Sequence, residues 1–223
     1  MKYFILTIPA FLLSLLSCSP KDFMAPEDPD IPITILVENS EFFPETGDTG
    51  EFVFYTNDSR YIKTYGMTFW AIKLPEQIVF DQVDISLSRI SGDQYAGFGF
   101  VFCHGLRGDP AVKTMLVFMI NLNQEYIIGE VFNDRFTVLV PWTSYLGLYP
   151  GYNQENRIKI SFDPINEEFQ LFINNHVDVL TTFKDDNSPV HRSGSSGFLT
   201  VISPLDKFPE IPVHIIFKNN TED

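Results

Sequence analysis

Residues 156–162 read NRIKISF, a stretch in which polar and apolar side chains alternate. Successive side chains of a β-strand point to opposite faces of the sheet, so Ile158, Ile160 and Phe162 share one face and the polar side chains share the other. Residues 163–166 (DPIN) are turn formers, and residues 169–173 (FQLFI) resume the alternation. The stretch therefore predicts two antiparallel strands, each with one buried face and one solvated face.

A second reversal follows at Asn174-Asn175. Asn tolerates the positive φ that a tight hairpin needs, so this pair predicts a turn into a return strand that carries Val177, Val179 and Phe183. Strand-like runs continue on both sides of this region, and helical periodicity is nearly absent after residue 32. The further predicted strands are residues 33–38, 52–55, 61–65, 68–74, 83–88, 97–103, 115–120, 125–132, 136–141, 198–202 and 213–217.

Three of these runs indicate how the sheets pack. Residues 83–88 alternate strictly, as expected for a strand with one wet face. Residues 97–103 place Phe98, Phe100 and Phe102 on one face and small residues on the other, which leaves room for a covering loop, a neighbouring side chain or a ligand. Residues 115–120 are apolar on both faces, as in a central strand covered on both sides. We expect an all-β domain over residues 33–223, a two-sheet antiparallel β-sandwich.

The first 17 residues have the pattern of an export signal: an early Lys2, an apolar run to Leu16, and the small Ser17 before Cys18. The apolar run is shorter than the roughly 20 residues of a membrane-spanning helix. Residues 15–18 (LLSC) resemble the bacterial lipobox, which implies cleavage before Cys18 and lipid attachment to its sulfur; an ordinary secretory signal is the alternative. Residues 18–32, rich in Pro and Asp, predict an extended tether between lipid and domain.

Lipid attachment to Cys18 would leave Cys103 as the only free thiol, so no intrachain disulfide is expected. Cys103 ends an apolar run and reads as a small buried hydrophobe; a reactive nucleophile is the alternative, because His104 adjoins it. Neighbouring residues on a strand point to opposite faces, which argues against a Cys103–His104 pair.

Charge excludes two classes of partner. The formal net charge is −14, and no cluster of Lys and Arg interrupts the acidic background. We therefore expect no nucleic acid partner, and no direct adhesion of the domain to anionic lipid.

The order of short motifs is similar to that of the bacterial concanavalin A-like lectin/glucanase and laminin G-like jelly rolls. These motifs are residues 91–92 (SG), 97–100 (GFGF), 142–144 (WTS), Gly151, 156–157 (NR), 172–175 (FINN) and 194–198 (GSSGF). The similarity covers roughly residues 40–218 and departs from the family pattern at Asn175, where Gly is usual. It implies a jelly roll, and it implies carbohydrate as the ligand class.

Catalytic and metal signals are weak. Glycosidases that such jelly rolls resemble use closely spaced acids on one strand, because retaining hydrolysis needs two carboxyl groups about 5–5.5 Å apart. No such run is present: Glu167-Glu168 flanks a turn, and Asp81 and Asp84 read as solvated surface. The histidines lack metal-ligand spacing. Asp185, Asp186 and Asn187 could form a loop calcium site, a metal that the resemblance also implies, or an exposed turn.

The best binding candidate is the aromatic segment of residues 142–153. Aromatic rings stack on the apolar faces of sugars and anchor protein interfaces, and amides add hydrogen bonds. The candidate ligand-binding residues are Trp142, Tyr145, Tyr149, Tyr152 and Asn153. The alternative is that this segment packs over a sheet edge.

Together these features predict an envelope lipoprotein whose jelly roll binds carbohydrate without turning it over. A scaffold that binds other envelope proteins and a glycoside hydrolase are the alternatives. Ser19, which follows Cys18, fits the bacterial sorting rule that sends lipoproteins to the outer membrane or cell surface.

Overall fold

The computed structural model describes residues 36–62, 64, 66–107, 111–133, 135–174, 179–184 and 193–221. The predicted signal, Cys18 and the tether lie outside these ranges, as do Val177 and residues 185–187. Within the described residues, strands dominate, and the two helices named are single 3-10 turns, η2 (Ser40–Phe42) and η3 (Ser59–Tyr61). This part of the chain contains no helix long and apolar enough to cross a bilayer.

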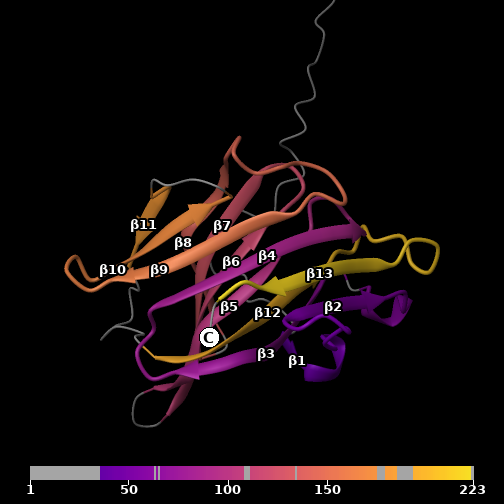
Figure 1. The fold of residues 1–223 in the computed structure, drawn as a ribbon. Helices are drawn as coiled ribbons and strands as arrows, with labels where there is room; N and C mark the ends of the chain where they lie inside the picture. Colours follow the sequence, from indigo (N-terminus) through magenta and orange to yellow (C-terminus); the bar gives the residue numbers. More distant parts are fainter. Residues whose placement is uncertain are drawn as a thin grey trace, which may run out of the picture.

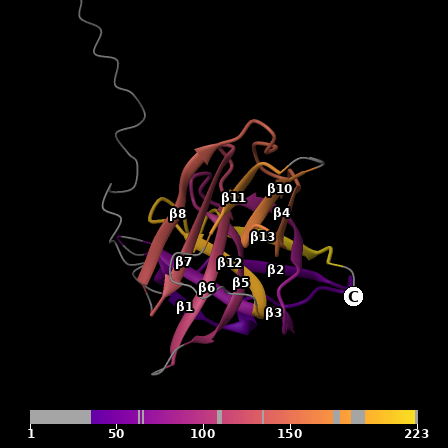
Figure 2. The ribbon, with the colours of Figure 1, turned by 90° about the vertical axis from the view of Figure 1, so that its left-hand side faces the viewer.

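The strands form two sheets that pack face to face (Figures 1 and 2). The seven-stranded sheet runs, in spatial order, β1 (Leu36–Glu38), β3 (Met67–Gln77), β12 (Gly194–Ile202), β5 (Phe98–Arg107), β6 (Val112–Ile120), β7 (Glu125–Phe132) and β8 (Arg135–Ser144). The six-stranded sheet runs β11 (Thr181–Phe183), β10 (Glu168–Ile173), β9 (Asn156–Asp163), β4 (Gln82–Ser91), β13 (Val213–Asn219) and β2 (Glu51–Thr56). The predicted all-β jelly-roll sandwich is confirmed.

Pairing is antiparallel throughout these two sheets except where β1 runs parallel to β3 at one edge. The predicted β9–turn–β10 hairpin is present, with Ile158 opposite Ile173 and Ile160 opposite Leu171. Asn174, at the second predicted turn, adopts a φ of 57°. The alternation of apolar residues therefore fixed the register of this part of the sheet.

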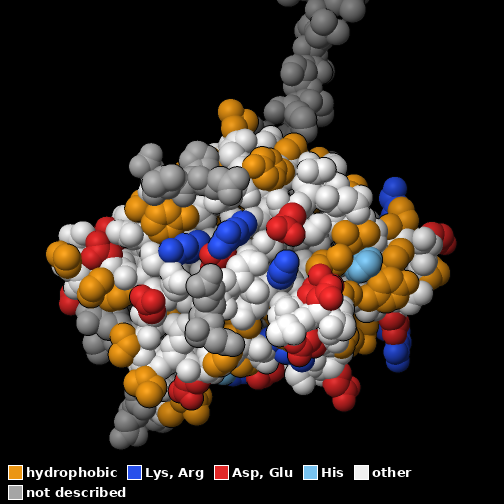
Figure 3. All heavy atoms as spheres, viewed as in Figure 1, with side chains coloured by type: hydrophobic (Ala, Val, Ile, Leu, Met, Phe, Trp, Pro, Cys, Tyr) orange, Lys and Arg blue, Asp and Glu red, His pale blue; other side chains and the backbone are white. Residues whose placement is uncertain are grey.

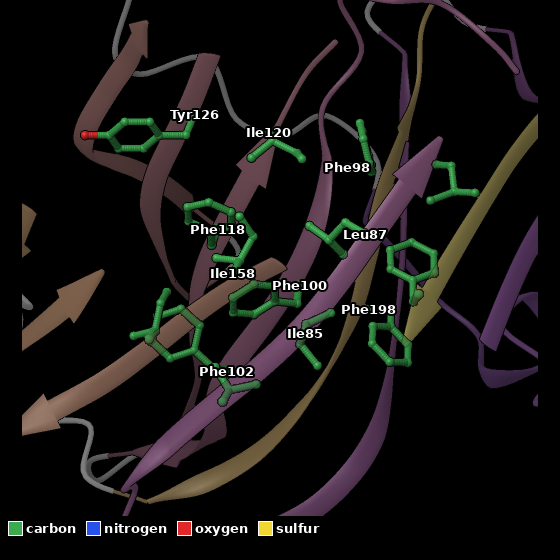
Figure 4. Packing of buried hydrophobic residues seen from close by; sticks show 14 of the residues in the cluster. Ile85, Leu87, Phe98, Phe100, Phe102, Phe118, Ile120, Tyr126, Ile158 and Phe198 are labelled. Carbon is green, nitrogen blue, oxygen red and sulfur yellow. The ribbon is translucent and has the colours of Figure 1, made fainter. Parts of the chain in front are cut away.

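The main core lies between the sheets and is rich in aromatic rings. Phe98, Phe100 and Phe102 of β5 all point inward, as their alternation predicts, toward Ile85 and Leu87 of β4 (Figure 4). Because each fully buried side chain of this size contributes about 1.5–3 kcal/mol, this layer is the principal source of stability.

A second, smaller apolar cluster lies on the outer face of the seven-stranded sheet. It includes Trp70, Val101, Met115 and Val117, all essentially buried. The prediction that β6 is covered on both faces is confirmed. A neighbouring side chain fills the space that the small Gly97 leaves on this face. A Cβ at position 97 would lie 2.8 Å from the Met119 sulfur.

One predicted strand is wrong. The strand predicted over residues 61–65 begins at Tyr61, but Tyr61 is the last residue of η3, and the next strand begins only at Met67. Asp58 precedes this turn, and its carboxylate accepts a hydrogen bond from the Arg60 amide at 3.0 Å. An Asp in this position satisfies an amide that a strand would have paired, which favours the helical turn.

Candidate functional site

A pocket of about 410 Å³ opens at the end of the sandwich where β4 leaves the six-stranded sheet and β13 enters it. Three segments line it: residues 90–95, Tyr152, and residues Leu205, Lys207 and Ile211 of the loop before β13. Its volume falls within the range of small-molecule sites, roughly 300–1,000 Å³.

The pocket presents two aromatic rings to solvent. Tyr95 is 58% exposed and Tyr152 is 42% exposed, and the aliphatic side chains of Leu205 and Ile211 add further apolar surface. Asp93 and Gln94 of the turn after β4 and Lys207 of the loop before β13 add polar groups. A wall of rings with a few polar groups is the usual composition of a site for a small polar molecule with apolar faces.

Arg89 lies beneath this pocket and is fully buried. It continues the inward-facing series of β4, and its guanidinium lies over the Phe98 ring, 4.7 Å from the centroid. One terminal nitrogen donates to the carbonyl oxygen of Asp93. Burial lowers the pKa of Arg89 to about 10, against the opposing influence of Asp206 and Asp93, so the group is still a cation at neutral pH. The Nε and Nη2 atoms have no hydrogen-bond partner among the described residues.

Asp206 joins the two loops that form the pocket walls. One carboxylate oxygen accepts the amide of Asp93 and the other accepts the amide of Ser203, each at 2.7 Å. Burial raises the pKa of Asp206, although both amide hydrogen bonds and the nearby Arg89 act in the opposite direction. A single carboxylate therefore fixes the turn after β4 against the loop before β13.

Tyr152 is held in place by its hydroxyl group, which donates to the carbonyl oxygen of Gly92 at 2.6 Å. Burial raises the pKa of this hydroxyl, so it stays a donor at neutral pH. Gly92 has a φ of 113°, and a Cβ there would lie 3.1 Å from Val213 and 3.2 Å from the Asp206 carboxylate. A larger residue at position 92 would therefore disturb both the turn and the Asp206 bridge.

Two asparagines organise the loop that delivers Tyr152. Asn156, which is buried, accepts the Tyr149 amide at 2.8 Å and donates to the Tyr149 carbonyl at 3.0 Å. The Asn174 side chain donates to Asn156 and to the carbonyl of Gly147, and it accepts the amide of Arg157. The loop thus gains side-chain partners in place of the ladder bonds that a strand would give it.

The structure distributes the predicted binding residues over different environments. Trp142 lies on β8 and packs against the apolar cluster on the outer face of the seven-stranded sheet, and Tyr145 packs against the main core. Tyr149 is exposed. The backbone N–H of Asn153 donates to the backbone carbonyl oxygen of Arg89 at 2.9 Å. Tyr152 is the member of this set that lines the pocket.

Sequence reasoning missed Arg89, Asp93, Tyr95 and Asp206. A signal for Arg89 was present, because it continues the inward series of Val83, Ile85 and Leu87 and thus places a charge in the core. Asp93, Tyr95 and Asp206 lie in loops that come together only in the tertiary fold, so no local sequence pattern indicates them.

The prediction that Asp84 lies on the solvated surface is wrong, because Asp84 is buried. Its two carboxylate oxygens accept hydrogen bonds from Nε and Nη2 of Arg157 at 2.9 and 2.8 Å. The pairing of β4 with β9 brings these two side chains together on the outer face of the six-stranded sheet.

Cys103 is buried in the main core, as predicted, whereas His104 packs against Trp70 with ring centroids 5.1 Å apart. Trp70 belongs to the outer cluster, so the two neighbours do point to opposite faces. Among the described residues, no group of three His, Cys, Asp or Glu side chains is placed to hold a metal. Asp185, Asp186 and Asn187 lie outside those residues, and a calcium site there remains a prediction.

Comparison with known proteins gives structural similarity only. No family model matches the chain, and no curated protein sequence matches it. Among solved structures, the carbohydrate-binding module CBM66 from Bacillus subtilis superposes with a TM-score of 0.51 at 9% identity, over 79% of this chain and 88% of the module. This similarity supports the sandwich fold.

Two further structures align with lower scores. A beta-1,3-glucanase from Mycobacterium marinum has a TM-score of 0.45 at 7% identity, over 77% of this chain and 74% of the glucanase. The carbohydrate recognition domain of Emp46p has a TM-score of 0.42 at 15% identity, over 79% of this chain and 85% of that domain.

Proposed function

We propose that this protein binds carbohydrate in the pocket between Tyr95 and Tyr152 and does not turn it over. The observation that carries the proposal is the pair of exposed tyrosine rings in a pocket of small-molecule size. A sugar has apolar C–H faces that stack on rings and hydroxyls that need donors and acceptors. Asp93, Gln94 and Lys207 offer such groups at the rim.

The rigid base of the pocket also supports binding. Arg89, Asp206 and the Tyr152 hydroxyl fix the walls through hydrogen bonds to backbone atoms that are independent of any ligand. A site whose walls are already ordered loses less conformational entropy when it binds. The fold likeness to a carbohydrate-binding module adds an analogy at the level of architecture.

The proposal of binding without turnover is supported by the roles of two carboxylates, Asp93 in the pocket and Asp206 behind its walls. Retaining hydrolysis needs one carboxyl group as acid and another as nucleophile, both facing the substrate. Asp206 is buried, and both of its oxygens accept backbone amides. Asp93 is then the carboxylate that lines the pocket. Among the described residues, a single half-buried carboxylate that lines the pocket suits hydrogen bonding to a sugar better than it suits this chemistry.

A protein-binding scaffold is the second candidate, because Leu205 and Ile211, which line the pocket, also expose aliphatic surface. A glycan array probed with residues 19–223 separates the two functions. Binding to one family of glycans, competed by the free sugar, is the expected result. No binding to any glycan would contradict carbohydrate recognition and favour the scaffold.

We further propose that lipid on Cys18 holds the domain at a bacterial membrane, at the outer membrane or cell surface. Support comes from the lipobox-like LLSC sequence and from the Pro- and Asp-rich segment between it and the first strand. Two or more acyl chains give stable anchoring. Mass spectrometry of the exported protein should find an acylated Cys18 at the new amino terminus, and Cys18→Ala should move the protein to the soluble fraction. A free thiol at Cys18 would contradict the anchor.

A further inference from the structure

The outer face of the six-stranded sheet carries a pair of rings next to the pocket, exposed Tyr55 and half-buried His214. Tyr55 of β2 lies opposite His214 of β13, and His214 lies opposite Ser91 of β4. Directly paired residues on neighbouring strands project to the same face, so Tyr55 and His214 share the outer face. Ser91 extends this row of paired positions to β4 across a β-bulge, because the register of β4 with β13 shifts between His214 and Ile215. Ser91 also lines the pocket. The row therefore leads from the pocket to the edge strand β2.

The two rings form a shallow platform. Their centroids are 5.7 Å apart at an interplanar angle of 74°, an edge-to-face arrangement, and Tyr55 is 54% exposed. Burial lowers the pKa of His214 below its ordinary value, so its ring is neutral at neutral pH. Figure 3 shows hydrophobic side chains gathered around a histidine over the end of β13 and β2.

The surroundings of the platform indicate the charge of its ligand. The next row on the same face pairs Ser88, Ile216 and Val53, all uncharged. A neutral imidazole and an uncharged row offer nothing that selects an acidic group. Ring faces and a neutral surface fit the C–H face of an uncharged sugar.

We propose that Tyr55 and His214 form a second sugar subsite, so that the ligand is a neutral oligosaccharide whose chain passes from the pocket onto the outer face of the six-stranded sheet. This inference rests on the proposed carbohydrate function of the pocket. The spacing is consistent with it: β4 and β2 are two strand positions apart, about 10 Å at the usual interstrand distance. A single sugar in the pocket leaves this platform bare, and a longer chain covers it.

The test measures affinity against chain length. Titration calorimetry would use β-1,3-gluco-, cello- and fructo-oligosaccharides, each from the monosaccharide to the hexasaccharide. For the series that binds, we expect affinity to rise about tenfold once the chain reaches the platform. Tyr55→Ala should remove this rise and leave the affinity for the monosaccharide, while Tyr55→Phe should retain it. Phe172→Ala, which removes an outward-facing ring from β10 of the same sheet, is the matched control and should have no effect.

The outcomes separate the platform from the pocket. An affinity that does not rise with chain length, or a rise that survives Tyr55→Ala, overturns the platform and leaves the pocket standing. If no oligosaccharide in these series binds the unaltered protein, both proposals fall. Should Tyr55→Ala not fold, the NMR signal of the His214 imidazole in the unaltered protein decides: a shift with the longer chain but not with the monosaccharide supports the platform, and no shift with either overturns it.

Discussion

In the middle of the sandwich Phe100 stacks on Phe118 with ring centroids 5.3 Å apart, whereas at the pocket end the next inward position of β4 holds the guanidinium of Arg89. The middle is stabilised by apolar burial, which needs no directional partners. The pocket end is stabilised by buried polar groups, each of which needs a partner. The first region builds the fold, and the second fixes the shape of the pocket.

The largest expected effect is in the middle. Phe118→Ala should lower the free energy of unfolding by about 3–5 kcal/mol, because it opens a cavity among rings that have no freedom to close it. Urea denaturation measures this loss. Phe132→Ala, which removes a partly exposed ring from the same sheet, is the control and should cost much less. Equal losses for the two variants would contradict the account of the core.

At the pocket end, Asp206→Ala should lower the free energy of unfolding by about 2–4 kcal/mol, because it removes the acceptor of two backbone amides and one of the two carboxylates near the Arg89 cation. It should also weaken ligand binding, which Phe118→Ala should spare while the protein is folded. Hydrogen exchange should show faster exchange at the Asp93 and Ser203 amides. Unchanged exchange at both amides would show that Asp206 does not join the pocket walls.

A smaller effect is expected at the loop that carries Tyr152. Asn156→Ala should cost about 1–3 kcal/mol, since it leaves the Tyr149 backbone without its side-chain partners. Thermal unfolding gives the comparison with Asn166→Ala, an exposed asparagine in the β9–β10 turn whose loss should lie within about 0.5 kcal/mol. If Asn156→Ala lowers the free energy of unfolding no more than Asn166→Ala does, Asn156 does not organise the loop.

The comparison also explains what could be predicted from sequence. The strands were predictable because Ile158, Phe100 and their neighbours alternate, and alternation is a local signal. Asn174 was predictable as a turn residue because Asn tolerates the positive φ that it adopts, which is also a local property. The pocket was not, because Asp206 reaches Asp93 across 113 positions. The predicted segment of residues 142–153 contributed Tyr152 to the pocket, while the places of Trp142 and Tyr145 depend on which strands neighbour β8.

The smallest expected effect concerns pH and the outer apolar cluster. Burial lowers the pKa of His104, which packs against Trp70 near Lys113 and Glu38. The unfolded chain therefore binds the proton more tightly, and the free energy of unfolding should rise with pH from the lowered pKa up to the ordinary value of about 6.5. Melting temperatures measured between about pH 5 and pH 7 test this, with His104→Gln expected to show a shallower rise. If the rise of the melting temperature with pH is unchanged in His104→Gln, other titratable groups cause it.

The most direct test of the central claim compares three variants in calorimetric titration with the sugar that the glycan array identifies. Tyr152→Ala should abolish measurable binding, Tyr152→Phe should retain most of it because the ring stays, and Phe172→Ala should bind as the unaltered protein does. Undiminished binding by Tyr152→Ala would show that the sugar is held elsewhere, and the pocket between Tyr95 and Tyr152 would lose its proposed function.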